Sequence, residues 1–224
     1  MNNLPKYYCT KVQREIEITG LGNDPLWQTA DVMSLLNMTP NNTTPVKTEV
    51  RMMYSDTCLY ISAICEDNYI HATFTEHDAP VFTEECMEFF LSPSSLMRQY
   101  YEINFSPTNV VFDSLILNHR SPEVPKAKFI GLTQYDCEGL ISKTVINGKM
   151  DTPGNFSWSL DVAIPFSNLL GPDNIVPNVG DSWRMNVYRI DIAAEDKKQY
   201  HYAWSAFEEI DFHRPWGFGT LFFK

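Results

Sequence analysis

The stretch FSWSLDVAI at 156–164 alternates large apolar side chains with small or polar ones at every second position. Its apolar members are Phe156, Trp158, Leu160, Val162 and Ile164. Successive side chains of a β-strand point to opposite faces, so a period of two predicts a half-buried strand. The segment TCLYISAICE at 57–66 has the same pattern and places Leu59, Ile61, Ala63 and Cys65 on one face.

The same period extends along most of the chain. Further strands are predicted at 10–19, 46–54, 85–92, 99–106, 109–117, 140–147, 182–192, 199–206 and 218–223. Turn signals such as GNDP, INGK and DTPGN separate them. A succession of antiparallel strands with loops of varied length indicates an all-β fold, an antiparallel β-sandwich or jelly roll. No repeat or low-complexity linker interrupts residues 1–224, which predicts a single domain.

Helix signals are few and predict one or two short helices. One follows Asp24, which suits an N-cap, with Pro25 at the first helical position. PFSNLL at 165–170 could form one turn. The segment 118–138 has the weakest strand pattern, and we expect a long loop or an edge hairpin there. Trp27 follows the DP turn, and we expect it to form a plug under the sandwich.

The charge balance excludes one class of partner. The chain has 17 Lys and Arg residues against 28 Asp and Glu residues, a net charge of −11. Binding of nucleic acid or of anionic membrane depends on basic side chains, so neither is expected. An acidic surface suits neutral or cationic ligands, or a hard cation such as calcium.

The cysteines and the N-terminal residues indicate the cellular compartment in which the protein is expected. The five cysteines are odd in number and form no C-x-x-C motif, so buried free thiols are expected in preference to a disulfide. They are Cys9, Cys58, Cys65, Cys86 and Cys137. The opening MNNLPKYYCTKV has no apolar leader region, and no apolar run is long enough to span a membrane. The expected location is the cytoplasm, or a secreted or periplasmic site after removal of a leader.

Motifs for catalysis are lacking, and we predict no catalytic residues. The sequence has no G-x-S-x-G, no H-E-x-x-H, no phosphate loop and no EF-hand loop. Its five histidines show no metal spacing, and surface positions are expected for them. Carboxylates that could pair as in a glycosidase are plentiful, as in any acidic protein: Glu84, Glu85, Glu88, Asp161, Asp191, Glu208 and Glu209.

Three strands carry polar and aromatic side chains on the face that alternates with their apolar face. Their inward residues are Met87, Phe89, Leu91, Tyr101, Ile103, Phe105, Trp183, Met185 and Val187. Their other face holds Cys86, Glu88, Phe90, Tyr100, Glu102, Asn104, Arg184, Asn186 and Tyr188. Rings can stack on the C–H faces of a sugar, while carboxylates, amides and guanidinium groups bond its hydroxyls. The alternative is an antiparallel sheet with one solvated face.

The order of these strands resembles carbohydrate-binding module family 9 and its family-9-like, DOMON-like relatives. The resemblance lies in LYISAICED, FTEECMEFFLSP, YYEINFSPTNVVFDS and WSLDVAIPF, and in the ending SWRMNVYRID, YAWSAF and FHRPWGFGTLFF. It covers roughly residues 10–224. It implies a jelly-roll β-sandwich that binds sugars, often at the ends of glycan chains, and that does no catalysis itself. Such modules are usually appended to glycoside hydrolases, and some hold structural calcium.

The resemblance implies that two aromatic rings clamp a terminal sugar. The first ring falls at Phe82, six positions before Glu88, and the second at Phe212, three before Pro215. Glu88 matches the glutamate that bonds sugar hydroxyls. Two departures stand out, because both clamp positions are Phe where tryptophan is larger, and Glu102 stands where an arginine can contact sugar. The remaining candidate contacts are Asn104, Asn186, Tyr188, Trp204 and His213.

The sequence therefore predicts a non-catalytic protein that binds the end of an oligosaccharide or polysaccharide and requires no cofactor. One alternative is a glycoside hydrolase or lyase on the same scaffold, and another is an interaction scaffold whose cleft is closed by its own loops. Asp67 and Asp78 are candidate ligands for a structural calcium, with exposed loop carboxylates as the alternative. By alternation Phe218, Leu221 and Phe223 belong to the core, and Trp216 has a packing role.

Overall fold

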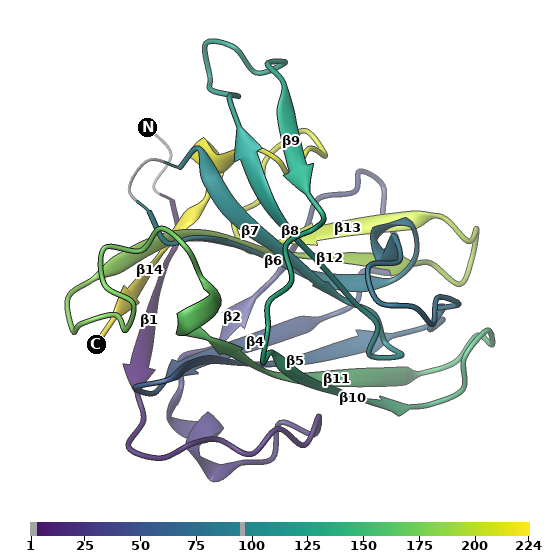
Figure 1. The fold of residues 1–224 in the computed structure, drawn as a ribbon. Helices are drawn as coiled ribbons and strands as arrows, with labels where there is room; N and C mark the ends of the chain where they lie inside the picture. The colour runs from purple at the N-terminus through teal and green to yellow at the C-terminus, as the bar shows by residue number, and fades with distance from the viewer. Residues whose placement is uncertain (1–3, 95–96) are drawn as a thin grey trace.

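The computed structural model describes residues 4–94 and 97–224, which are built almost entirely of β-strands (Figure 1). The strands are β1 (Lys6–Lys11), β2 (Met33–Ser34), β3 (Leu36–Asn37), β4 (Thr48–Tyr54), β5 (Cys58–Asp67), β6 (Cys86–Ser92), β7 (Gln99–Phe105), β8 (Val111–Asn118), β9 (Phe129–Leu132), β10 (Ile141–Asn147), β11 (Phe156–Pro165), β12 (Ser182–Ile192), β13 (Gln199–Ala203) and β14 (Gly219–Phe223). The all-β prediction is confirmed.

The strands form two layers. The first sheet runs β9-β8-β7-β6-β12, and the same edge of β12 pairs first with β14 and then with β13. The second sheet runs β10-β11-β5-β4, with β2 on the outer edge of β4. The main core lies between them and contains the apolar residues of FSWSLDVAI and TCLYISAICE together with the predicted inward residues of β6, β7 and β12. Alternation therefore identified the inner faces correctly.

Strand β1 joins the two sheets. Its first half pairs in parallel with β14, where Tyr7 lies opposite Leu221, and its end pairs in parallel with β4, where Thr10 lies opposite Met53. The sandwich is therefore mixed, and its antiparallel pairing is broken at β1. Parallel neighbours need a long connection, and residues 12–47 supply one between β1 and β4.

The predicted strand at 10–19 is wrong beyond residue 11. Residues 12–19 form an irregular segment that covers the outer face of the second sheet. Val12, Ile16 and the buried Trp27 pack there against Tyr60, so their apolar character serves a small second core. The carboxylate of Asp161 accepts hydrogen bonds from the amides of Gly20 and Gly22 at 2.8 and 3.1 Å, which fixes this segment on the sheet.

The helical segments are single 3₁₀ turns: η1 (Pro25–Thr29), η2 (Val81–Thr83), η3 (Phe166–Asn168) and η4 (Pro215–Gly217). The two turns that the sequence indicates are η1, where the Asp24 side chain accepts from the Leu26 amide, and η3. None of the helical elements in the described chain has the length and hydropathy of a membrane-spanning segment.

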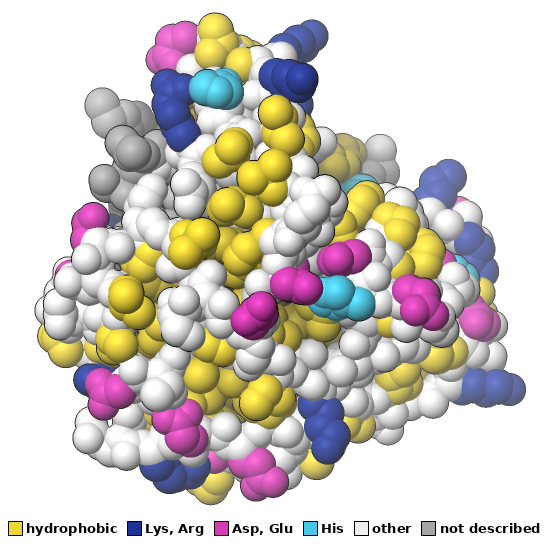
Figure 2. All heavy atoms as spheres, viewed as in Figure 1, with side chains coloured by type: hydrophobic (Ala, Val, Ile, Leu, Met, Phe, Trp, Pro, Cys, Tyr) yellow, Lys and Arg dark blue, Asp and Glu magenta, His cyan; other side chains and the backbone are white. Residues whose placement is uncertain are grey.

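Segment 118–138 contains an edge hairpin, which is one of the two structures expected for it; the other was a long loop. Strand β9 pairs with β8 in an antiparallel register that places Ile130 opposite Leu117. The hairpin projects from the body of the sandwich (Figure 1), and hydrophobic side chains follow it on the face seen in Figure 2.

The expected free thiols are also found: Cys58 is half-buried, and Cys9, Cys65, Cys86 and Cys137 are buried.

Candidate ligand-binding cleft

The outer face of the first sheet is partly covered by the C-terminal arm, which we define as residues 204–218. The Phe218 ring packs edge-on against Phe90 and Tyr100, with centroids 6.2 and 5.3 Å away. These rings form a small outer core with Tyr188, Met38 and neighbouring residues. The part of the face beneath Phe218 is therefore filled by the chain itself, and a cleft lies over the neighbouring part.

Two of the predicted contact residues hold the arm in place. Asn186 binds the backbone of Ser205 twice, because its amide nitrogen donates to the carbonyl at 2.9 Å and its oxygen accepts from the N–H at 2.8 Å. Trp204 is buried and packs into the main core. Neither residue lines the open cleft. Their polar and aromatic character is therefore used to bind the arm to the sheet.

The open part is a cleft of about 480 Å³ between the arm, the β8–β9 hairpin and the loop that contains η2. It is lined by Phe82, Glu88, Glu102, Phe112, Ser114, Ile116, Phe129, Gly131, Thr133, Ile190, Gln199, His201, Ile210, Phe212 and His213. Five of the predicted site residues meet here: Phe82, Glu88, Glu102, Phe212 and His213. Asn104 and Tyr188 do not line the cleft but contact residues that do: Asn104 lies beside Glu88 and donates to Glu102, and Tyr188 stacks on Phe212.

The two predicted clamp rings are supported in different ways. Phe82 is 37% exposed on η2 and packs edge-on against Phe112, with centroids 5.2 Å apart. Phe212 is half-buried and stacks flat on Tyr188, with centroids 4.0 Å apart. The Tyr188 hydroxyl also donates to the Phe212 carbonyl at 3.0 Å. Tyr188 therefore fixes both the ring and the backbone of the second clamp position.

Two carboxyl groups form the polar floor of the cleft. Glu88 on β6 lies opposite Asn104 on β7, so Glu102 is its diagonal neighbour on the same face of the sheet. Burial and the neighbouring charge of Glu102 raise the pKa of Glu88 well above its usual range. Burial also raises the pKa of Glu102 to about 7, against a hydrogen bond that the Asn104 amide donates at 3.0 Å. Near neutral pH the floor therefore retains at least one proton and offers both a donor and acceptors.

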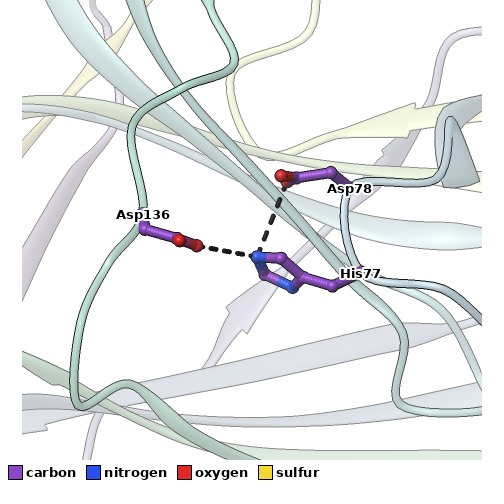
Figure 3. A group of neighbouring side chains, drawn as sticks. All are labelled: His77, Asp78 and Asp136. Atoms are coloured by element: carbon purple, nitrogen blue, oxygen red, sulfur yellow. Dashed lines mark hydrogen bonds and ion pairs between the residues drawn. The ribbon is translucent and has the colours of Figure 1, made fainter.

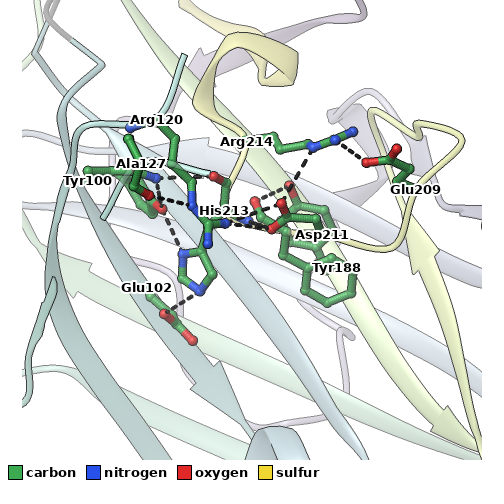
Figure 4. A network of polar contacts seen from close by, with 11 residues as sticks. Tyr100, Glu102, Arg120, Ala127, Tyr188, Glu209, Asp211, His213 and Arg214 are labelled. Atoms are coloured by element: carbon green, nitrogen blue, oxygen red, sulfur yellow. Dashed lines mark hydrogen bonds and ion pairs between the residues drawn. The ribbon is translucent and has the colours of Figure 1, made fainter. Parts of the chain in front are cut away.

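His213 adds a neutral donor to this floor (Figure 4). The Asn118 amide donates to the Tyr100 hydroxyl at 3.0 Å, which leaves the hydroxyl proton for His213 Nδ1 at 2.7 Å. His213 therefore carries its own proton on Nε2, which lies 3.8 Å from Glu102 Oε2. Burial lowers the pKa of His213 to about 4, so the ring is uncharged at neutral pH.

A stack of three side chains closes one side of the cleft. The Phe129 ring lies on the His213 ring, with centroids 4.1 Å apart, and the Arg120 guanidinium lies 4.6 Å above Phe129. Arg120 also donates to both carboxylate oxygens of Asp211, at 3.1 and 3.2 Å, and to the Ala127 carbonyl. Figure 4 shows how this network ties the β8–β9 hairpin to the arm.

Sequence reasoning missed the contribution of β8 and β9. Phe112, Ser114 and Ile116 alternate along β8, and this pattern could have placed them together on the outer face. Phe129 lies on β9, in the segment with the weakest strand signal, and no local pattern marks its ring as part of the site. Residues of β12 and β13 complete the lining with Ile190 and His201.

The two candidate calcium ligands lie in different clusters. Asp67 belongs to a buried group with Glu85 and Asp191, and Asp78 to an exposed group with His77 and Asp136. In the buried group Arg189 Nη2 lies 2.8, 3.3 and 2.7 Å from Asp67, Glu85 and Asp191. Calcium requires six to eight oxygen ligands around an open centre. A guanidinium already fills that centre, so this group of residues does not fit a calcium ion.

The chain was compared with known families and structures. The model of the family described as carbohydrate-binding family 9 matches residues 27–223. No match is found among curated proteins. A "putative carbohydrate-binding protein" from Bacteroides uniformis superimposes with a TM-score of 0.76 at 16% identity, covering 99% of this chain and 100% of the other.

Two further structures come from one organism, Caldicellulosiruptor kristjanssonii, and are of a family 9 carbohydrate-binding module. The complex with cellotriose has a TM-score of 0.67 at 14% identity, covering 98% of this chain and 94% of that one. The complex with glucose has a TM-score of 0.68 at 13% identity, covering 98% and 96%. At these identities the likeness shows the shared fold.

Proposed function

The chain belongs to carbohydrate-binding family 9, and from that premise we propose that its cleft binds the end of a glycan without catalysing a reaction. The observation that carries the proposal is the meeting of Phe82 and Phe212 in one cleft above the polar floor of Glu88 and Glu102. These residues are far apart in the chain, and the fold brings them together. Solved members of the same fold hold cellotriose and glucose.

The rings supply the apolar part of the recognition. The exposed ring of Phe82 and the ring face of Phe212 turned away from Tyr188 are the surfaces on which the C–H face of a sugar would stack. Phenylalanine offers a smaller surface than tryptophan and no polar edge. We therefore expect weak binding, with dissociation constants on the order of micromolar to millimolar.

The floor supplies the polar part of the recognition. Sugar hydroxyls both donate and accept, and they pair well with groups that do the same. The Glu88 and Glu102 pair retains a proton, and His213 presents an N–H beside it. A neutral sugar suits this floor, because an anionic ligand would meet buried carboxyl groups and a protein of net charge −11.

Calorimetric or NMR titration with a panel of mono- and oligosaccharides tests the proposal, preceded by a glycan-array screen. Phe82→Ala and Phe212→Ala should each weaken binding several-fold. Phe222→Ala is the matched control, because Phe222 is a partly exposed phenylalanine that stacks on Tyr8 outside the cleft. Binding that survives both cleft substitutions unchanged would overturn the clamp.

The preference for a chain end needs a separate comparison. We propose that the cleft takes a terminal sugar because the arm covers the neighbouring part of the same face, where Phe218 packs against Phe90 and Tyr100. An oligosaccharide should be titrated beside its borohydride-reduced form, which lacks a closed terminal ring at the reducing end. A third ligand, the same oligosaccharide blocked at its non-reducing end, tests whether the cleft recognises that end instead. Equal affinity for all three would contradict recognition of an end.

A glycoside hydrolase is the second candidate, and one observation favours it. Glu88 and Glu102 are two neighbouring carboxyl groups in one cleft, and the pKa of Glu102, raised to about 7, suits a general acid. Glycosidases place their carboxyl groups on either side of the scissile bond, whereas these two rise diagonally from one sheet. We therefore prefer the binding function. Turnover of aryl-glycosides that is lost in Glu102→Gln would reverse this preference.

A further inference from the structure

A second hollow lies on the opposite side of β8 from the cleft. Side chains alternate along this strand, so Phe112 and Ser114 face the cleft, whereas Val111 and Asp113 face the second hollow. The hollow has a volume of about 370 Å³. It is lined by His77, Asn109, Val111, Asp113, Asp136, Cys137, Leu140, Ile141 and Ser142.

Three polar side chains converge at its rim. His77 Nε2 lies 2.9 Å from Asp136 Oδ1 and 3.6 Å from Asp78 Oδ1 (Figure 3). Asp136 comes from a different loop and points at the imidazole from the other side of the gap, as Figure 3 shows. One nitrogen therefore faces two carboxylates, and a single N–H can make a good hydrogen bond with only one of them.

A fourth group points to a missing partner. Asp113 is 2% exposed, and its Oδ2 accepts a hydrogen bond from the Cys137 amide at 3.2 Å. Its Oδ1 is buried and has no hydrogen-bond partner among the described residues. A buried carboxylate oxygen without a partner is costly. Because Asp113 lines the same hollow as His77 and Asp136, a cation bound there would relieve this cost.

We propose that His77, Asp78 and Asp136 form a binding site for a divalent transition-metal ion of the zinc type, with the Asp113 carboxylate in the same hollow as an additional anion. Zinc accepts both imidazole nitrogen and carboxylate oxygen at ~2.0–2.2 Å, usually with four tetrahedral ligands. Such bond lengths separate neighbouring ligand atoms by roughly 3.3 Å, and the observed separations of 2.9 and 3.6 Å lie on either side of that value. Calcium prefers oxygen ligands alone, so the histidine argues against it.

The position of this site gives it a structural role. Asp78 lies shortly before η2, which carries Phe82, and Asp136 lies shortly after Thr133 on the opposite side of the cleft. A metal bound to both aspartates would hold the η2 loop against the loop that follows β9. The metal would then fix two borders of the cleft without touching a ligand inside it.

Zinc titration of the full chain tests the proposal, after treatment with EDTA and dialysis into a buffer that does not chelate metals. We expect one equivalent of Zn²⁺ to bind, and calcium at the same concentration to compete poorly. His77→Gln should weaken zinc binding by at least about tenfold. The His77 side chain is 50% exposed, so this substitution should leave the fold intact.

His71 offers a matched control. It also lies beside two carboxylates, but its Nδ1 faces Asp151 at 2.7 Å and its Nε2 faces Glu84 at 3.8 Å. The two ring nitrogens point to different sides, so these carboxylates cannot share one ion with His71. His71→Gln should therefore leave zinc affinity unchanged. In NMR spectra the ring signals of His77, and not those of His71, should shift on addition of zinc.

Asp113→Asn tests this neighbouring anion separately, because the amide oxygen can still accept from the Cys137 N–H while the negative charge is lost. We expect weaker zinc binding in this variant as well. Three results would overturn the proposal: no saturable zinc binding below millimolar concentration, equal zinc affinity in wild type and His77→Gln, or tighter binding of calcium than of zinc.

Discussion

The rings of Tyr188 and Phe212 lie parallel, with centroids 4.0 Å apart and an angle of 7° between their planes. Tyr188 is fully buried in β12, so its ring is a rigid support for the half-buried ring of Phe212. One face of Phe212 is therefore used by the protein, and the other is held in a defined orientation. A ring fixed before binding loses less conformational freedom when a ligand stacks on it.

Replacement of Tyr188, which supports the Phe212 ring, should weaken sugar binding even though Tyr188 does not line the cleft. In Tyr188→Leu the parallel stack is lost, and we expect sugar affinity to fall about 3- to 10-fold, consistent with ~0.5–1.5 kcal/mol for an aromatic pair. Tyr188→Phe is the control, because it keeps the stack and removes only the bond to the Phe212 carbonyl. Calorimetric titration compares the two, and equal losses in both would assign the effect to that hydrogen bond.

A larger ring at the first clamp position should strengthen binding. Phe82 is 37% exposed, so Phe82→Trp has room at the mouth of the cleft and should alter folding stability by less than about 0.5 kcal/mol. The wider indole should raise affinity for a stacked sugar several-fold, while Phe82→Ala lowers it. Titration with the best ligand from the array measures both. An unchanged affinity in both variants would mean that Phe82 serves only to pack against Phe112.

The faces of the strands could be predicted from the sequence, but the cover over one of them could not. Period-two alternation correctly separated Phe89 and Ile103 in the core from Glu88 and Glu102 on the other face. It does not show what lies above a face, because that depends on a segment distant in the chain. Asn186 illustrates the limit, since its partner Ser205 belongs to an arm whose path no local pattern records.

The spacing of apolar residues also led to a wrong strand prediction beyond residue 11, because the fold buries these residues in an irregular segment. Val12 and Ile16 suggested a strand, yet they anchor an irregular segment against Trp27 and Tyr60. Apolar residues report burial, and only a sustained period distinguishes a strand from a loop that packs on a sheet. The two predicted clamp residues, Phe82 and Phe212, came from the family resemblance, and their meeting in one cleft could not be worked out from spacing.

The Glu102 carboxyl should make stability decline as pH rises. Its pKa is about 7 in the folded protein and near 4.5 when exposed, so the folded state binds more protons between these values. The contribution of Glu102 to the free energy of unfolding therefore falls as pH increases from about 4.5 to 7, by roughly 3 kcal/mol at most. In urea unfolding at several pH values, the stability of the wild type minus that of Glu102→Gln should fall over this range. A difference that stays constant with pH would assign any such decline to Glu88.

His213 should produce the opposite slope on the acid side. Its pKa is about 4 in the folded protein and near 6.5 when exposed, so the unfolded state binds more protons between these values. The contribution of His213 to the free energy of unfolding therefore falls as pH decreases from about 6.5 to 4, and it opposes the Glu102 contribution where the two ranges overlap. In the same urea series, the stability of the wild type minus that of His213→Asn should fall as pH decreases over this range. An NMR titration that places the His213 pKa above 6 would contradict the expectation.

Arg189 should be among the most sensitive positions for folding. It is fully buried and bonds Asp67, Glu85 and Asp191, so Arg189→Met would leave three carboxyl groups without their cation. Loss of one partner of a buried ion pair costs about 3–5 kcal/mol, and we expect a loss of at least that size at pH 7 by chemical denaturation.

Arg184→Met is the control for this prediction. Arg184 lies on the same strand, and within the described part of the chain its side chain bonds only the backbone carbonyls of Gly219 and Phe218. Arg184→Met should lower the free energy of unfolding by about 1–2 kcal/mol, as expected for the loss of hydrogen bonds rather than for an uncompensated charge. Similar losses in the two variants would show that the three carboxyl groups do not depend on Arg189 for their charge balance.

The parallel pairing of β1 with β14 sets an order for folding during synthesis. Tyr7 leaves the ribosome long before its partner Leu221 is made, and the edge of β12 that receives β14 stays unpaired until then. Unpaired edges promote association with other chains, and non-local pairings of this kind form slowly. The nascent chain is therefore exposed to aggregation, or dependent on chaperones, until β14 has left the ribosome.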